Sequence, residues 1–147
     1  MGVYTRYKRD PGGFRKLVEL LETTPKSRRE RMIDVGMEED PEYTERALQY
    51  IMNFDDVLGM SDVELAEVIA TAPPRMTAFA VCKLEENVKQ RFLRCSKPKI
   101  ATEIKDLLNA NITMTEVGGA QLRLVQSARE AEKKGLVKTK RIPLQAA

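Results

Sequence analysis

Apolar residues recur at helical spacing along almost the whole chain. Phe14, Leu17, Val18 and Leu21 lie three or four residues apart and predict a helix that begins after Gly12-Gly13. Strict alternation of apolar and polar side chains, which would indicate a half-buried strand, nowhere extends over six residues. The pattern therefore predicts an all-α fold.

Capping and turn residues divide this pattern into about eight helices of roughly ten residues. Ser61 and Glu64 have the spacing of a capping box, in which each side chain bonds to the other's backbone N–H. Thr115 is expected to cap a long final helix that ends at Gly135, and Gly118-Gly119 within it indicates close helix packing or a kink. The predicted helices begin near Gly13, Pro25, Pro41, Ser61, Pro74, Glu85, Ser96 and Thr115, with a short turn over residues 54–58.

The helix spacing predicts two lobes. The first three helices each follow Pro or Gly, which is typical of a small helical-repeat lobe, and the helices after Phe54 form a second lobe. We expect a basic N-terminal extension over residues 1–12, the first lobe over 13–52, the second lobe over 53–137 and a basic tail over 138–147.

Charge is distributed unevenly along these lobes. The 147 residues include 25 Lys and Arg against 22 Asp and Glu, for a net charge of +3. Residues 32–67 nevertheless hold eleven acidic residues and a single basic one, whereas the segments on both sides are basic. Such banding affects association with partners more than it affects the fold.

Candidate catalytic chemistry is sparse. The chain has no histidine, which excludes Ser-His and Cys-His triads and imidazole ligation of a metal. Adjacent acidic residues diverge on a helix and do not build a two-carboxylate site. No Walker loop, G-x-G-x-x-G or Cys-x-x-Cys pattern is present. We therefore expect no enzyme activity, no cofactor and no metal.

The sequence favours a cytoplasmic location. No apolar run approaches the length of about 18 residues that a membrane helix needs, and no signal peptide is visible. Cys82 and Cys95 fall on different predicted helices, so we expect reduced thiols.

A basic stretch leaves a second class of function open. Its side chains could follow nucleic-acid phosphates, although Phe92 is the sole aromatic residue among them. Nucleic-acid binding is therefore the less favoured alternative. The stretch comprises Lys89, Arg91, Arg94, Lys97, Lys99 and Lys105.

Several short motifs, taken in order, resemble a known family. They include the segment from Glu38 to Glu42, the segment from Ile51 to Val57, Phe92-Leu93-Arg94 and Ile104-Lys105-Asp106. Together with Val117, Ala120-Gln121 and Gly135, they resemble the C-terminal half of the flagellar motor switch protein FliG across most of the chain.

The resemblance implies an armadillo-like lobe that a hinge joins to a second helical lobe. It also implies a charged ridge that meets the cytoplasmic loop of the stator protein MotA, across which torque is exerted. Other surfaces would contact FliM, further rotor subunits and other copies of the chain. The hinge would be Ile51, Met52, Asn53 and Phe54, and the ridge would be Lys83, Lys99, Lys105 and Asp106.

The expected function is accordingly that of a rotor protein for torque generation and switching. Its expected place is the cytoplasmic side of the flagellar basal body, at the periphery of the inner membrane. The family's other half carries a Glu-His-Pro-Gln motif, which a chain without histidine cannot contain. We expect either a divergent stand-alone relative or a piece of a longer protein. A non-flagellar scaffold that keeps the fold is the alternative.

Overall fold

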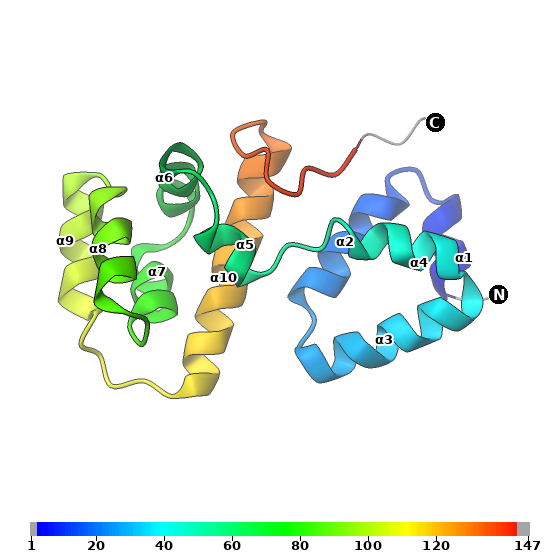
Figure 1. The fold of residues 1–147 in the computed structure, drawn as a ribbon, viewed down its shortest axis with the longest axis horizontal. Coiled ribbons are helices and arrows are strands. Elements are labelled where there is room, and N and C mark those ends of the chain that lie inside the picture. Colours follow the sequence, from blue (N-terminus) through cyan, green and yellow to red (C-terminus); the bar gives the residue numbers. More distant parts are fainter. Residues whose placement is uncertain (1–2, 144–147) are drawn as a thin grey trace. The chain divides into compact units, whose positions relative to one another are not determined.

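The computed structural model describes residues 3–143, and this part of the chain contains ten helices and no strand. The predicted all-α class is confirmed. Of the described residues, 3–52 and 140–143 form one compact unit. Asn53–Thr139 form a second compact unit, which holds the longest helix (Figure 1).

The first unit packs its helices around one apolar core. Phe14 of α2 lies edge-on to the ring of Tyr43 in α4, with ring centres 5.6 Å apart. The helices are α1 (Val3–Arg9), α2 (Gly13–Thr23), α3 (Lys26–Glu39) and α4 (Pro41–Leu48). The core consists of Tyr4, Phe14, Leu17, Val18, Leu21, Tyr43, Ala47 and Ile142.

Helix α1 belongs to this core, although the sequence predicted a basic extension over residues 1–12. Tyr4 is only 2% exposed, and its hydroxyl donates a hydrogen bond to the carbonyl oxygen of Met32. A Cβ atom on Gly36 would overlap the Tyr4 ring, so glycine at this position lets α1 approach α3. The lobe therefore begins before residue 13; a helix of seven residues is too short to show a clear apolar period.

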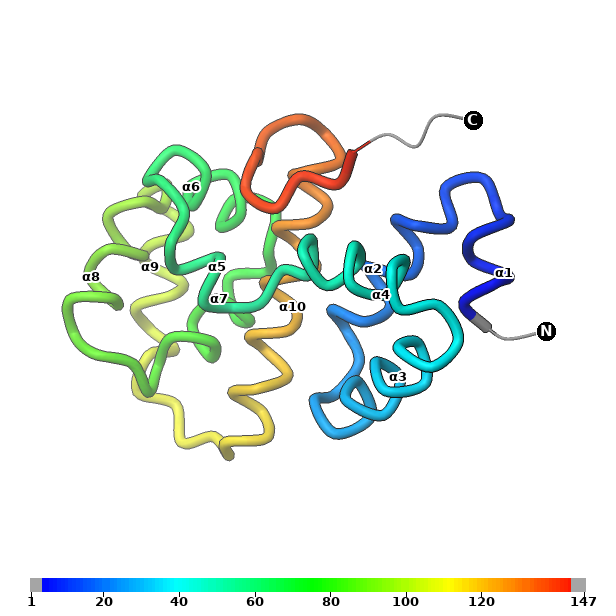
Figure 2. The backbone as a smooth tube through the Cα atoms, turned by 45° about the vertical axis from the view of Figure 1, so that its right-hand side comes forward, coloured from blue at the N-terminus to red at the C-terminus, as the bar shows by residue number. Residues whose placement is uncertain are grey.

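The second unit is organised around α10, a helix of 20 residues and about 30 Å. Helices α5, α6 and α7 pack against α10, and α9 packs against α7 and α8 (Figure 2). The helices are α5 (Phe54–Leu58), α6 (Asp62–Thr71), α7 (Pro74–Val81), α8 (Glu86–Arg94), α9 (Pro98–Leu107) and α10 (Met114–Lys133).

Helix α10 begins one residue after Thr113, which forms the capping box with Glu116. The Glu116 backbone N–H donates to Thr113 Oγ1 at 3.1 Å, and the Thr113 N–H donates to the Glu116 carboxylate at 3.2 Å. The prediction that Thr115 caps this helix is wrong. Close packing at Gly118 and Gly119 is also wrong, because a Cβ atom there would meet nothing within 4 Å.

Only one of the two hydrogen bonds of the predicted capping box at Ser61 is present. Ser61 Oγ accepts the N–H of Glu64 at 3.2 Å, as predicted. The Glu64 carboxylate instead accepts the backbone N–H groups of Lys138 at 2.6 Å and Thr139 at 3.1 Å, and the Thr139 hydroxyl at 2.9 Å. Glu64 therefore ties the segment after α10 to α6.

The segment predicted as a basic tail, residues 138–147, is packed as far as the structure describes it. Lys138 and Thr139 are held by Glu64, and Ile142 is 3% exposed in the core of the first unit. Residues 144–147 lie outside the described residues. A short segment with one buried isoleucine has no periodicity that would predict its burial from the sequence.

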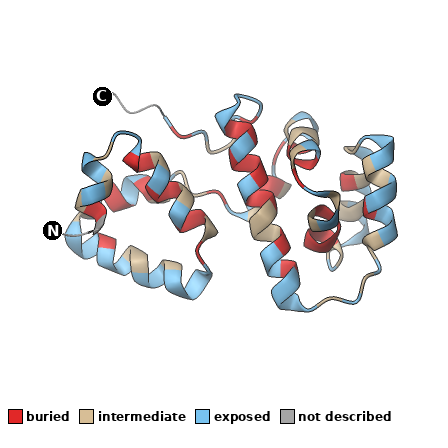
Figure 3. Ribbon diagram, turned by 180° about the vertical axis from the view of Figure 1, so that it is seen from behind, coloured by how far each residue is buried: buried red, intermediate tan, exposed pale blue. Residues whose placement is uncertain are grey.

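Burial differs sharply between helices. Buried residues recur along α10, and the last five residues of α7 are all buried (Figure 3). Helix α3 is the opposite case, because Gly36 is the one buried residue of its 14. This helix therefore leaves most of its surface exposed.

Candidate functional site

The predicted hinge contains the boundary between the two units, which falls between Met52 and Asn53. On the side of the first unit, Met52 is 1% exposed and its backbone N–H donates to the Glu22 carboxylate at 2.8 Å. Ile51 is half-buried and packs against the same unit's core. The chain is therefore firmly held up to its last residue in this unit.

On the side of the second unit, Asn53 is the N-cap of α5. Its side-chain oxygen accepts the N–H of Asp56 at 2.9 Å, and the Asp56 carboxylate accepts the N–H of Asn53 at 2.9 Å. Phe54, the first residue of α5, is half-buried. Asn53, one of the predicted hinge residues, thus has a capping role. A single peptide link thus joins two residues that are each held by their own unit.

The chain passes between the units a second time, between Thr139 and Lys140. Lys140 has a φ of +54°, a left-handed conformation that non-glycine residues rarely adopt. Its ammonium group donates to the carbonyl oxygen of Gln49 in the first unit at 3.2 Å. This second link is not evident from the sequence, because a Lys-rich segment gives no indication that one of its residues adopts a left-handed backbone conformation.

The predicted ridge residues lie on α9 and on the turn after α7. Helix α9 starts with Pro98 at its first position and buries Ile104. Among the described residues, none of the four ridge side chains makes a hydrogen bond or ion pair, and all four are exposed. Three of them come from α9, namely Lys99, Lys105 and Asp106, and Lys83 follows the end of α7, which packs against α9.

Glu103 belongs to this surface, although the sequence analysis did not include it. It lies four residues after Lys99 and three before Asp106, so these three share one face of α9. Glu103 is exposed and has no partner among the described residues. The helical period, applied within α9, would have found it. The ridge is therefore a stripe of mixed charge rather than a basic patch.

One residue of the basic stretch considered for nucleic-acid binding, Arg91, is already hydrogen-bonded within the second unit. Its guanidinium donates to Asp62 Oδ1 at 2.9 Å, to the carbonyl oxygen of Leu58 at 2.8 Å and to that of Met60. The hydrogen bond from Arg91 holds the pKa of the Asp62 carboxyl below its ordinary value. Arg91 thus fixes the turn between α5 and α6 and is not available for phosphates.

Neither a metal site nor a membrane-spanning helix is visible in the part of the chain that the structure describes. Across residues 3–143, no cluster of three or more His, Cys, Asp or Glu side chains could hold a metal ion. No helix in that range combines the length and the apolar character needed to span a bilayer.

A family model described as the FliG C-terminal domain matches residues 37–138. The flagellar motor switch protein FliG of Aquifex aeolicus (strain VF5) is 26% identical over 121 residues, which cover 81% of this chain and 37% of that protein. FliG of Thermotoga maritima is 21% identical over 126 residues, covering 84% and 38%. The chain thus spans less than two fifths of the length of these relatives.

Solved structures show the same fold. A crystal structure of a FliG fragment from H. pylori has a TM-score of 0.61 at 14% identity, over 93% of this chain and 66% of that one. The structure of full-length FliG from Aquifex aeolicus has a TM-score of 0.54 at 25% identity, over 84% and 39%.

Proposed function

Because the chain belongs to the FliG C-terminal domain family, we propose that it is a rotor component of a flagellar motor switch. It acts through protein contacts rather than catalysis, at the cytoplasmic side of the basal body. The observation that supports this most directly is the ridge on α9. Its charged side chains are exposed and have no partners among the described residues.

The ridge is the surface we assign to the cytoplasmic loop of the stator protein MotA. Along one face of α9, the positive Lys99 is followed by two acidic side chains, Glu103 and Asp106, and a loop with the opposite order of charges would match it. Each exposed ion pair contributes only about 0–1 kcal/mol, so such a contact can align two proteins and still release. Repeated engagement and release is what a torque-transmitting contact requires.

The links between the units suit the switching part of this function. Met52 and Asn53 are each anchored by hydrogen bonds within their own unit, and Thr139 is anchored to Glu64 in the second unit. Changes of backbone dihedral angles confined to the two links, Met52–Asn53 and Thr139–Lys140, would leave these hydrogen bonds intact. The remaining surfaces are assigned to FliM, to other rotor subunits and to further copies of the chain. The assignment of these partners rests on the family to which the chain belongs and on the accessible surface of both units.

The test of the stator contact is a pull-down of the full chain with the MotA loop encoded in the same genome. Lys99→Glu and Asp106→Lys are each expected to reduce capture at least fivefold, because each places like charges opposite one another. Lys134→Glu, at the end of α10 and outside the ridge, should leave capture within twofold of wild type. Charge reversal in the loop should partly restore capture by the matching ridge variant.

Two results would reject this function. One is equal capture by the wild type and both ridge variants, which would remove the ridge from the stator contact. The other is normal swimming of a strain that lacks the gene. Normal swimming together with retained self-association would instead support the non-flagellar scaffold.

A further inference from the structure

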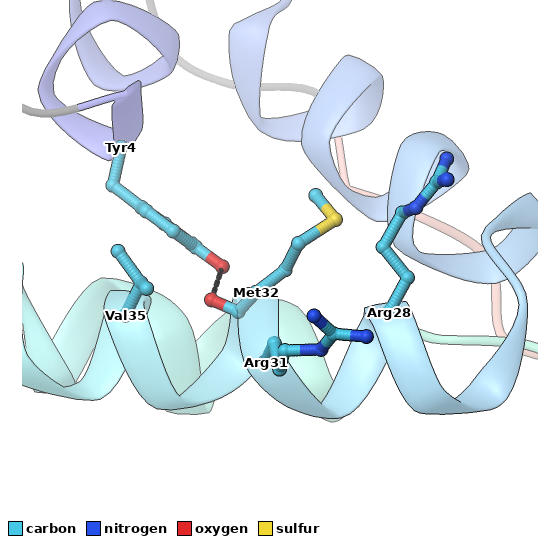
Figure 4. A pocket seen from close by; sticks show the side chains of 5 residues that line it. All are labelled: Tyr4, Arg28, Arg31, Met32 and Val35. Carbon is cyan, nitrogen blue, oxygen red and sulfur yellow. Dashed lines mark hydrogen bonds between the residues drawn. The ribbon is translucent and has the colours of Figure 1, made fainter.

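The first unit carries an open pocket of about 440 Å³ between α1 and α3 (Figure 4). Every residue that lines it comes before residue 37, so it lies outside the part matched by the family model. The ridge and the links between the units do not contribute to it. The lining residues are Tyr4, Arg28, Arg31, Met32 and Val35.

The pocket exists because α1 is too short to cover α3. Helix α1 has 7 residues and α3 has 14, which correspond to lengths of about 10 Å and 21 Å. Tyr4 meets α3 near Gly36 and donates its hydroxyl proton to the carbonyl oxygen of Met32. The Tyr4 ring thereby becomes a fixed wall beside Met32 and Val35, and α3 continues beyond it toward its N-terminus.

Helix α3 has unusually little tertiary support for its length. Gly36 is its one buried residue, while Val35 is 46% exposed and Met37 is 36% exposed. Isolated helices of this length are marginal in water and depend on packing of an apolar face. An added apolar cover over Met32 and Val35 would therefore stabilise α3.

The same face also carries positive charge. Arg28, Arg31, Met32 and Val35 follow the spacing i, i+3, i+4, i+7, which places them on one side of the helix. Arg28 and Arg31 are exposed and make no hydrogen bond or ion pair with other described residues. Figure 4 shows Arg28 and Met32 rising from α3 on the side of Tyr4. One half of the face is therefore cationic and the other half apolar.

We propose that this face binds an acidic amphipathic helix of a partner protein. The partner inserts an apolar side chain between Tyr4, Met32 and Val35, and its carboxylates pair with Arg28 and Arg31. A guanidinium binds a carboxylate through two parallel hydrogen bonds, which also orients the partner. A helix supplies apolar and acidic positions at the required spacing. A small molecule in this open pocket would remain largely exposed to water, whereas sites for small ligands normally enclose most of the ligand surface.

The experiment uses the full chain and a fluorescein-labelled synthetic helix with Leu at i, i+4 and i+7 and Glu at i+1 and i+8. Fluorescence anisotropy should show saturable binding that weakens with salt. The double variant Arg28→Glu, Arg31→Glu and the single variant Val35→Asp should each weaken binding at least tenfold. Lys26→Glu reverses a single charge on the opposite side of α3 and should alter binding less than twofold.

The place of binding is read from ε-methyl NMR signals of the methionines. The Met32 methyl should shift on addition of the peptide, and the Met114 methyl, 68% exposed in the second unit, should not. Equal binding of a peptide with Ser in place of Leu would overturn the proposal, as would equal weakening by Lys26→Glu. Preference for vesicles of anionic lipid over the peptide would overturn it, and so would self-association of the chain that Val35→Asp abolishes.

Discussion

The Glu22 carboxylate accepts a hydrogen bond from the Met52 backbone N–H at 2.8 Å, although 30 residues separate the two. Both groups are buried, so removal of the acceptor leaves a donor without a partner inside the protein. Glu22 therefore holds the last residue of the first unit in place, directly before the link to the second.

Glu22→Ala is expected to lower the free energy of unfolding of the first unit by about 1–3 kcal/mol. Glu22→Gln keeps an acceptor oxygen and should cost less. Urea titration and amide exchange at Met52 measure the two effects, with Glu45→Ala, an exposed acidic position on α4, as the control. Unchanged exchange at Met52 in the alanine variant would show that the hydrogen bond is unimportant.

Gly36 and Gly119 predict opposite effects of the same substitution. A Cβ atom on Gly36 would collide with the Tyr4 ring and the Thr44 hydroxyl, so Gly36→Ala should destabilise the protein by about 1–3 kcal/mol or more. Gly119→Ala meets nothing within 4 Å on α10 and should stabilise it by about 1 kcal/mol. Thermal unfolding followed by circular dichroism distinguishes them; a rise in Tm for both would contradict the packing at Gly36.

The contact of the Glu64 carboxylate with Lys138 and Thr139 should be sensitive to acid. Partial burial acts to raise the pKa of its carboxyl, but hydrogen bonds from Lys138, Thr139 and Ser61 dominate and hold that pKa below its ordinary value. A lowered folded-state pKa stabilises the fold above the unfolded-state pKa, and this stabilisation is lost as the pH falls through the folded-state value.

Glu64→Gln should therefore be less stable than the wild type at pH 7, and the difference should shrink as the pH is lowered below about 4. Urea unfolding at pH 7, 5, 4 and 3 measures the difference at each step. Glu67→Gln, one turn further along α6, is the control because the Glu67 carboxylate makes no hydrogen bond or ion pair with other described residues. A difference that is independent of pH would refute the role of the Glu64 charge.

The left-handed conformation of Lys140, at the second link between the units, should make glycine more stable than alanine at this position. Its φ of +54° is left-handed, and a non-glycine residue costs roughly 1 kcal/mol in that conformation. Lys140→Gly and Lys140→Ala both lose the hydrogen bond from Nζ to the carbonyl oxygen of Gln49. The glycine variant should nevertheless be more stable than the alanine variant by about 1 kcal/mol in urea titration. Equal stability would mean that the backbone relaxes at this position.

Local patterns in the sequence were sufficient for most of the helices. The apolar period of Phe14, Leu17 and Leu21 and the prolines at the starts of α4, α7 and α9 act within one or two turns, so they are readable without the fold. The ridge was predicted from the family resemblance, which did not include Glu103. The family was evident from residues that recur in order along the chain.

Longer-range contacts were not readable in this way. Arg91 was predicted as a basic surface residue, but its partners lie 29 to 33 residues earlier. Glu64 was expected to bond within its own helix start, but it binds backbone 74 and 75 residues later. A charged side chain has several partners within reach, and the local sequence does not say which of them the fold brings close.

The sequence by itself determined the helical class, because helix periodicity and capping are local properties of the chain. The spacing of the helices predicted two lobes, and the candidate ridge follows from the family resemblance and stays a prediction. The tertiary structure alone decided that α1 and Ile142 complete the first core, that the chain passes twice between the units, and that Arg28 and Arg31 border an open apolar pocket. These features depend on which helices pack together and on how far each one covers its neighbour. That is a matter of geometry between distant segments, which no local pattern encodes.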